Sequence, residues 1–150
     1  MENAESLDIM LIRNCAGGIV FYENQVLLIQ NDKEEWSFPK GVIRYDDSDD
    51  EVAVWRVKEE AGVNSRIIAL AGRTSYEFYS LSRKKPVANR IIWYLMVADS
   101  AEAEPNLEEG VFKARFFPIE EAVERVTYSQ DKSLLSLAIQ KYKELNEVVE

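Results

Sequence analysis

The chain has 150 residues, 47% of them hydrophobic and 30% charged, and its net charge is −9. This length and composition favour one folded domain over residues 1–150 and argue against a disordered chain. The acidic charge argues against a nucleic-acid partner, because phosphates are repelled and the longest basic run is only Arg83-Lys84-Lys85. A small anionic substrate stays compatible with this charge if local cations or a metal offset it.

Short apolar runs predict the strands. Residues 18–22 and 25–30 predict a hairpin that turns at Glu23-Asn24. The second run is apolar on both faces, so we expect a central, covered strand. Further strands are predicted at residues 65–70, 74–79, 90–98 and 114–117.

Three helices are predicted between and after these strands. Ser48 and Glu51 have the spacing of a capping box, and the helix that they begin is expected to stop at Gly62. The other helices are predicted at residues 119–126 and 129–148. The order of elements predicts an α/β (α+β) fold, with a mixed β-sheet sandwiched between α-helices rather than a regular βαβ alternation.

The compartment is inferred from what the sequence lacks. Cys15 is the one cysteine, which excludes an internal disulfide, and the absence of histidine leaves a catalytic thiol without its usual base. We therefore expect Cys15 to be a buried small side chain. No apolar run approaches the ~20 residues of a membrane span, so we expect a cytoplasmic protein with no membrane partner. Residues 1–8 are polar and expected to be flexible.

Residues 36–63 carry the chemistry. They read Trp-Ser-Phe-Pro-Lys-Gly-Val-Ile-Arg-Tyr-Asp-Asp-Ser-Asp-Asp-Glu-Val-Ala-Val-Trp-Arg-Val-Lys-Glu-Glu-Ala-Gly-Val. Positions 56, 59 and 60 are three and four residues apart, so they share one helix face. Glu59 and Glu60 on that face supply carboxylates, which Mg²⁺ and Mn²⁺ prefer as ligands.

This segment resembles the box of the Nudix hydrolase family: Gly, five residues, Glu, seven residues, then Arg-Glu-aliphatic-any-Glu-Glu-any-Gly-aliphatic. The matching residues are Gly41, Val57, Glu59, Glu60, Gly62 and Val63. Three positions depart from the box: Asp47 replaces Glu, Trp55 replaces Arg, and Arg56 replaces the first Glu of the helix cluster.

The resemblance extends over residues 14–142. Ala16–Val20 is similar to the family's opening strand, and Arg115–Ala122 is similar to its last strand and the following helix. Trp36–Gly41 resembles the branch that acts on dinucleoside and diphosphoinositol polyphosphates. The resemblance therefore implies the Nudix fold, and dimerisation is common enough in that family to allow a homodimer.

The implied activity is metal-dependent hydrolysis of a nucleoside diphosphate linked to another moiety, such as a dinucleoside polyphosphate. Mg²⁺ or Mn²⁺ would be held by Gly41, Asp47, Glu59 and Glu60. Glu59, Glu60 and Glu109 are the expected catalytic residues, and Glu109 would act as an extra metal ligand or general base. The alternative for Glu109 is that it belongs to a solvated acidic loop over residues 99–110.

Arg56 weakens this expectation. Its guanidinium is spaced to pair with both Glu59 and Glu60, so it could take the charge role of a metal ion while removing one ligand. Trp55 is expected to pack against a neighbouring loop, with stacking on a base as the alternative. A catalytically impaired Nudix domain that binds a nucleotide or a partner is therefore the second hypothesis, and a scaffold without a small ligand is the third.

The expected substrate-binding residues are Lys40, Gly41, Tyr76, Arg83 and Arg90. The resemblance places Lys40 and Gly41 against phosphate, and Arg83 and Arg90 near distal phosphates. A solvated hairpin tip is the alternative for the two arginines. Tyr76 either stacks on a base or fills one face of the sheet.

Overall fold

The computed structural model describes residues 9–149, so the expectation for residues 1–8 lies outside it. Seven strands, three helices and one 3-10 turn follow each other within these residues. They are β1 Leu11–Tyr22, β2 Gln25–Gln30, β3 Trp36–Ser37, β4 Lys40–Val42, α2 Asp49–Ala61, β5 Ser65–Ser80, β6 Lys85–Ala98, η1 Leu107–Glu109, β7 Lys113–Pro118, α3 Ile119–Arg125 and α4 Ser129–Val149.

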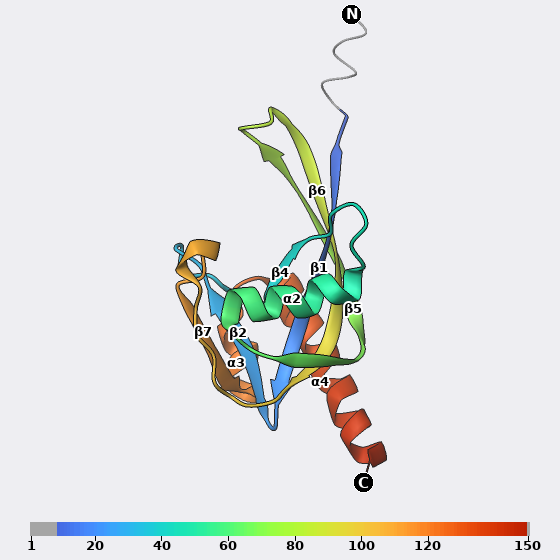
Figure 1. Ribbon diagram of the computed structural model, residues 1–150, viewed down its shortest axis with the longest axis vertical. Helices are drawn as coiled ribbons and strands as arrows, with labels where there is room; N and C mark the ends of the chain where they lie inside the picture. The colour runs from blue at the N-terminus through green and yellow to red at the C-terminus, as the bar shows by residue number, and fades with distance from the viewer. Residues whose placement is uncertain (1–8, 150) are drawn as a thin grey trace, which may run out of the picture.

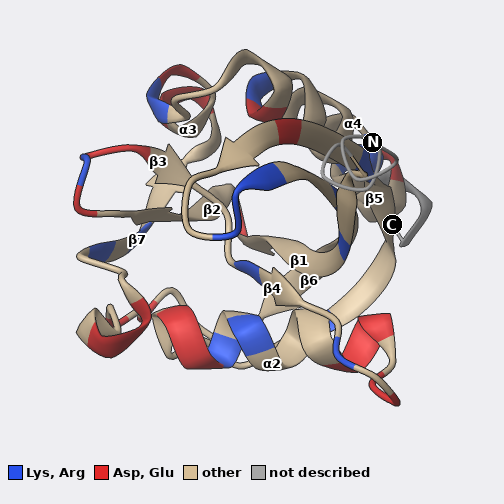
Figure 2. Ribbon diagram, turned by 90° about the horizontal axis from the view of Figure 1, so that it is seen from above, with Lys and Arg blue, Asp and Glu red and all other residues tan. Residues whose placement is uncertain are grey.

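The seven strands form one mixed, strongly curled sheet. Its main order is β3-β2-β1-β6-β5, with β4 on β1 and β7 on β2. Strands β1 and β6 run parallel, while the other pairs are antiparallel. Helix α2 covers one side of the curled sheet, and α3 and α4 cover the opposite side (Figures 1 and 2). The predicted fold class is therefore confirmed.

Each side of the sheet has its own core. Val57, Ala53 and Met96 belong to the cluster under α2. Trp93 and Leu135 belong to the cluster under α3 and α4. The two faces of the strands are thus both apolar, as the continuous run of β2 predicted.

Local sequence signals placed several boundaries correctly. Tyr22 pairs with Gln25, so the predicted hairpin turns at Glu23-Asn24, and Glu23 adopts a positive φ of 54°. Helix α2 ends at Gly62 in the left-handed conformation with φ 67°, and the Gly62 N–H donates to the Lys58 carbonyl. Glycine lacks a Cβ, so it adopts this conformation without strain.

The capping box is a correction. Ser48 lies at the N-cap of α2, but its side chain makes no capping hydrogen bond. The Glu51 N–H instead donates to Asp50 Oδ1 over 2.8 Å. An acidic residue within the first turn can satisfy a free N–H group, so the serine hydroxyl is not required for it.

Two predicted strands are in fact one. Strand β5 is continuous from Ser65 to Ser80, and register shifts occur between Ile67 and Ala69 and between Leu70 and Gly72. Two strands were predicted, at residues 65–70 and 74–79, but the ladder with β6 continues between them and accommodates the extra residues as bulges. The β5–β6 hairpin consequently extends well beyond the helices (Figure 1).

Candidate active site

One arginine holds the carboxyl end of α2 to an acidic loop. Arg56 Nη2 lies 2.6 Å from Glu60 Oε2 and 2.6 Å from Glu109 Oε1, and Arg56 Nε donates to Glu60 Oε2 over 3.2 Å. The Arg56 and Glu60 side chains are 14% and 9% exposed, whereas Glu109 is 36% exposed. The pairing is therefore well shielded on the helix side and open on the loop side.

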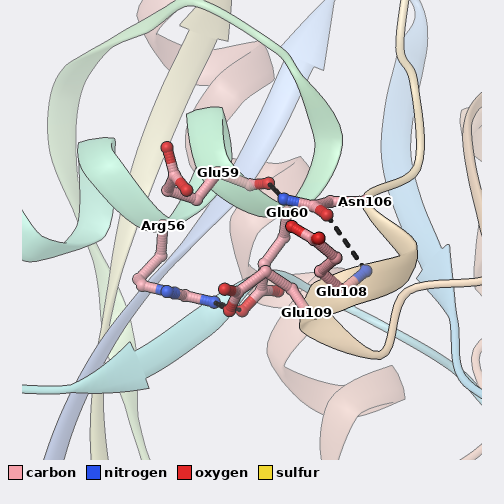
Figure 3. A network of polar contacts seen from close by, with 6 residues as sticks. All are labelled: Arg56, Glu59, Glu60, Asn106, Glu108 and Glu109. Carbon is pink, nitrogen blue, oxygen red and sulfur yellow. Dashed lines mark hydrogen bonds and ion pairs between the residues drawn. The ribbon is translucent and has the colours of Figure 1, made fainter.

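The expected partner of Arg56 was partly wrong. Glu60 pairs with Arg56 as predicted, but the second partner is Glu109, fifty-three residues further along the chain. The Glu59 carboxylate points away from the guanidinium (Figure 3). Helix spacing permitted both glutamates, and the approach of a distant loop decided between them.

Asn106 explains why the loop approaches. Its Nδ2 donates to the Glu59 carbonyl over 2.9 Å, and its N–H donates to the Glu60 carbonyl over 3.2 Å (Figure 3 draws the side-chain bond). The Glu104 N–H donates to the Ala61 carbonyl over 2.8 Å. The last carbonyls of a helix lack partners within it, so the loop satisfies them and is fixed against the helix end. Sequence reasoning missed Asn106, although an asparagine before Leu-Glu-Glu is a typical cap signal.

Burial shapes the electrostatics of Glu60. Desolvation by burial raises the pKa of this carboxyl, and the Arg56 pair and the Lys40 charge oppose that shift. The Lys40 backbone also contributes to lowering this pKa. Lys40 and Gly41 therefore lie beside the acid cluster, which consists of Glu60 and Glu109 paired with Arg56.

Gly41 makes room for Arg56. A Cβ added at Gly41 would lie 2.6 Å from Arg56 Cδ, 2.7 Å from Nε and 2.9 Å from Cγ. The arginine stem thus runs over the bare backbone of β4. Trp55 is 55% exposed, and Arg56 Cζ lies 5.3 Å from its ring centroid. The ring therefore contacts the guanidinium, and its expected packing on a neighbouring loop stays a prediction.

A cleft of about 500 Å³ opens on the side of the sheet away from α2. Polar, charged and aromatic side chains line it. They are Asn31, Glu35, Ser37, Lys40, Thr74, Tyr76, Ile91, Trp93, Tyr128, Ser129, Gln130 and Asp131. Lys40 and Tyr76 are two of the residues predicted to bind substrate. Trp93, Tyr128 and Asp131 were missed, because a core strand and the first turn of an amphipathic helix carry no signal for a cleft.

Charged groups inside the cleft influence one another. Burial raises the pKa of Asp131, and the Lys40 charge opposes the shift. Hydrogen bonds from Tyr128 and Asn31 lower the pKa of Glu35. Lys40 therefore acts electrostatically on Asp131 in the cleft and on Glu60 in the acid cluster.

The two arginines predicted to bind distal phosphates, Arg83 and Arg90, lie in different places. Arg90 and Arg73 line a second cleft of about 560 Å³, which shares Thr74, Ile91 and Gln130 with the first. Arg83 lies in the turn between Ser80 and Lys85, at the tip of the β5–β6 hairpin. Strand geometry puts that turn about 14 Å beyond Tyr76, so Arg83 corresponds to the alternative of a solvated tip.

Comparisons with known proteins agree with this geometry. The NUDIX domain pattern matches residues 12–137. The chain belongs to the NUDIX domain family. A relative from Mycobacterium tuberculosis named as mutator protein MutT4 is 31% identical over 104 residues, covering 69% of this chain and 40% of that protein. The chain thus spans about two fifths of the length of this curated relative.

Solved Nudix structures share the fold. A C. elegans Ap4A hydrolase superposes with a TM-score of 0.67 at 16% identity, covering 88% of this chain and 98% of that one. An ADP-ribose pyrophosphatase from Streptococcus suis superposes with a TM-score of 0.67 at 20% identity, covering 87% and 91%. No helix within residues 9–149 is long and apolar enough to cross a membrane.

Nudix hydrolases generally use divalent metals, but the side chains here do not fit one. Among residues 9–149, no three acidic or cysteine side chains are grouped to hold a metal ion. Asp47 is exposed in the turn before α2, and the 13-residue helix separates it by about 20 Å from the Glu60 end. Of the predicted ligands, Gly41 and Glu60 thus lie together beside Arg56, whereas Asp47 lies at the other end of α2 and the Glu59 carboxylate points away. A guanidinium occupies the place where Glu60 and Glu109 meet.

Proposed function

We propose that this Nudix domain is a pyrophosphohydrolase acting on a nucleoside diphosphate linked to another moiety. The observation that carries the proposal is the double role of Lys40. It lines the cleft, and its charge opposes the rise in the pKa of Glu60 in the acid cluster. A ligand in the cleft would thus bring its phosphates beside the acid cluster.

The cleft offers groups suited to both halves of such a ligand. Tyr76, which is 42% exposed, provides aromatic surface for a base and is oriented by a 2.7 Å hydrogen bond from Asn89. Lys40 is the one lysine or arginine among the described residues that line the cleft. Its ammonium group is suited to bind phosphate oxygens. Arg90 in the adjoining cleft would meet more distant phosphates.

The acids have distinct environments that suggest distinct roles. Glu109 is the more exposed partner of Arg56, so we propose it as the base that orients water. Glu60 is buried and would position Arg56 rather than contact solvent. Glu59 is free of the guanidinium and remains a candidate for direct contact with the ligand.

Turnover of a panel of nucleoside diphosphate sugars, ADP-ribose and dinucleoside polyphosphates tests the proposal. Each compound is assayed with Mg²⁺, with Mn²⁺ and with a chelator. Glu109→Gln should lower kcat at least tenfold, while the neighbouring Glu108→Gln should leave it nearly unchanged. Absence of turnover for every compound would overturn the hydrolase assignment.

Lys40→Met separates ligand binding from chemistry. It should reduce the rise in melting temperature that a nucleoside diphosphate produces, since a bound ligand stabilises the native state by mass action. Lys58→Met on the exposed side of α2 is the matched control. A cytoplasmic location and a homodimer stay predictions, tested by cell fractionation and by the mass in solution.

A Nudix domain that binds a nucleotide without hydrolysing it is the second candidate. The observation that favours it is the Arg56 pairing with Glu60 and Glu109, which engages two of the three predicted catalytic acids. Nucleotide-dependent stabilisation without turnover in the same panel would select this candidate.

A further inference from the structure

The acid cluster already contains a cation. Glu60 comes from helix α2 and Glu109 from the loop at η1, and Arg56 Nη2 lies 2.6 Å from an oxygen of each. One nitrogen therefore bridges helix and loop at charge-assisted hydrogen-bond distance. Figure 3 shows the two carboxylates converging on this group.

The position of Arg56 is constrained on several sides. Its stem lies over Gly41, where even a Cβ would come within 2.6 Å. Its guanidinium lies 5.3 Å from the Trp55 ring centroid, and only 14% of the side chain is exposed. An arginine held by two carboxylates, a ring and a bare backbone segment has little freedom to withdraw.

A second cation could not share this place. A divalent ion takes carboxylate oxygens at about 2.0–2.6 Å, which is the space that Nη2 fills here. It would also repel the guanidinium, whose charge cannot be removed by deprotonation at ordinary pH. Glu60 and Glu109 are thus available either to Arg56 or to a metal, but not to both.

We infer that Arg56 is the resident cation of this site and that it excludes divalent metal ions from Glu60 and Glu109. The guanidinium links the helix to the loop, with a single fixed charge that depends on no metal supply. This inference concerns the cation alone, so it holds whether or not the domain hydrolyses its ligand.

Mn²⁺ titration without substrate tests the inference, with binding followed by electron paramagnetic resonance and calorimetry. The wild type should show no saturable site that depends on Glu60. Arg56→Gln should bind Mn²⁺ at least tenfold more tightly, and Glu60→Gln added to that variant should abolish the gain. Arg66→Gln removes an exposed charge from β5 and controls for the general rise in negative charge.

Two outcomes would overturn the inference. One is saturable Mn²⁺ binding to the wild type that Glu60→Gln removes. The other is a folded Arg56→Gln protein, verified by circular dichroism, that binds Mn²⁺ no better than Arg66→Gln. Arg56→Lys keeps the positive charge and should still exclude Mn²⁺. If Arg56→Gln does not fold, the wild-type titration with its Glu60→Gln control still decides the question.

Discussion

Gly41→Ala should displace Arg56 without touching either acid. The added methyl would lie 2.6 Å from Arg56 Cδ and 2.7 Å from Nε, distances at which the arginine must move. The Nη2 contacts to Glu60 and Glu109, both 2.6 Å, depend on the path of that stem. We therefore expect the substitution to weaken both ion pairs.

The size of the effect follows from the burial of each pair. A shielded hydrogen bond to a charged group contributes about 1.5–3 kcal/mol, which applies to Arg56–Glu60. The Glu109 pair is more exposed and contributes at most about 1 kcal/mol. Alanine restricts the unfolded chain more than glycine, which offsets about 1 kcal/mol. The net loss in unfolding free energy is about 0.5–3 kcal/mol, or a melting temperature lower by about 1–12 °C for a domain of this size.

A double-mutant cycle with Arg56→Ala isolates the cause. Without the arginine stem the methyl has open space, so Gly41→Ala should then be neutral or slightly stabilising. Denaturant unfolding of the four proteins should give a coupling free energy of about 1–3 kcal/mol. The control is Gly72→Ala, whose Cβ would meet only Leu134 at 3.3 Å and should not couple to Arg56. Equal costs of Gly41→Ala in both backgrounds would refute the reasoning.

Three other predictions concern the loop and two titratable groups. Asn106→Ala removes the 2.9 Å bond to the end of α2, so it should cost about 1–2 kcal/mol and speed amide exchange over residues 104–110; unchanged exchange would contradict the anchoring role. Burial raises the pKa of Asp131 above its ordinary 3.8. The protonated side chain therefore favours the folded state, and this contribution to the unfolding free energy is lost as the pH rises from the unfolded-state pKa through the folded-state pKa. Asp131→Asn should therefore raise the unfolding free energy at neutral pH and lose this advantage below about pH 4, unlike the exposed Asp99→Asn; a pH-independent difference would exclude this account. Burial and a 2.8 Å bond to Asp49 raise the pKa of Tyr94 to about 12, so Asp49→Asn should move its absorbance titration part of the way toward 10.0, and an unmoved curve would refute the coupling.

Local signals were sufficient for most of the secondary structure. The turn after Tyr22, the end of α2 at Gly62 and the covered strand β2 were all predicted from neighbouring residues. Such features depend on backbone preference and on the apolar period, both of which are local. The strand break near Gly72 was predicted wrongly, since pairing with β6 overrides local propensity.

The candidate site was predicted less completely than the secondary structure. The sequence by itself determined that Arg56 replaces a carboxylate on the face that holds Glu60, and that Lys40 and Gly41 precede this helix in the order typical of a Nudix box. Only the tertiary structure decided that Glu109 is the second partner of Arg56. It also brought Tyr128 and Asp131 to the cleft beside Lys40. Helix spacing predicts which side chains share a face. A partner fifty residues away depends instead on where its loop makes hydrogen bonds. Here the loop bonds to the carbonyls at the end of α2, which have no partner within the helix.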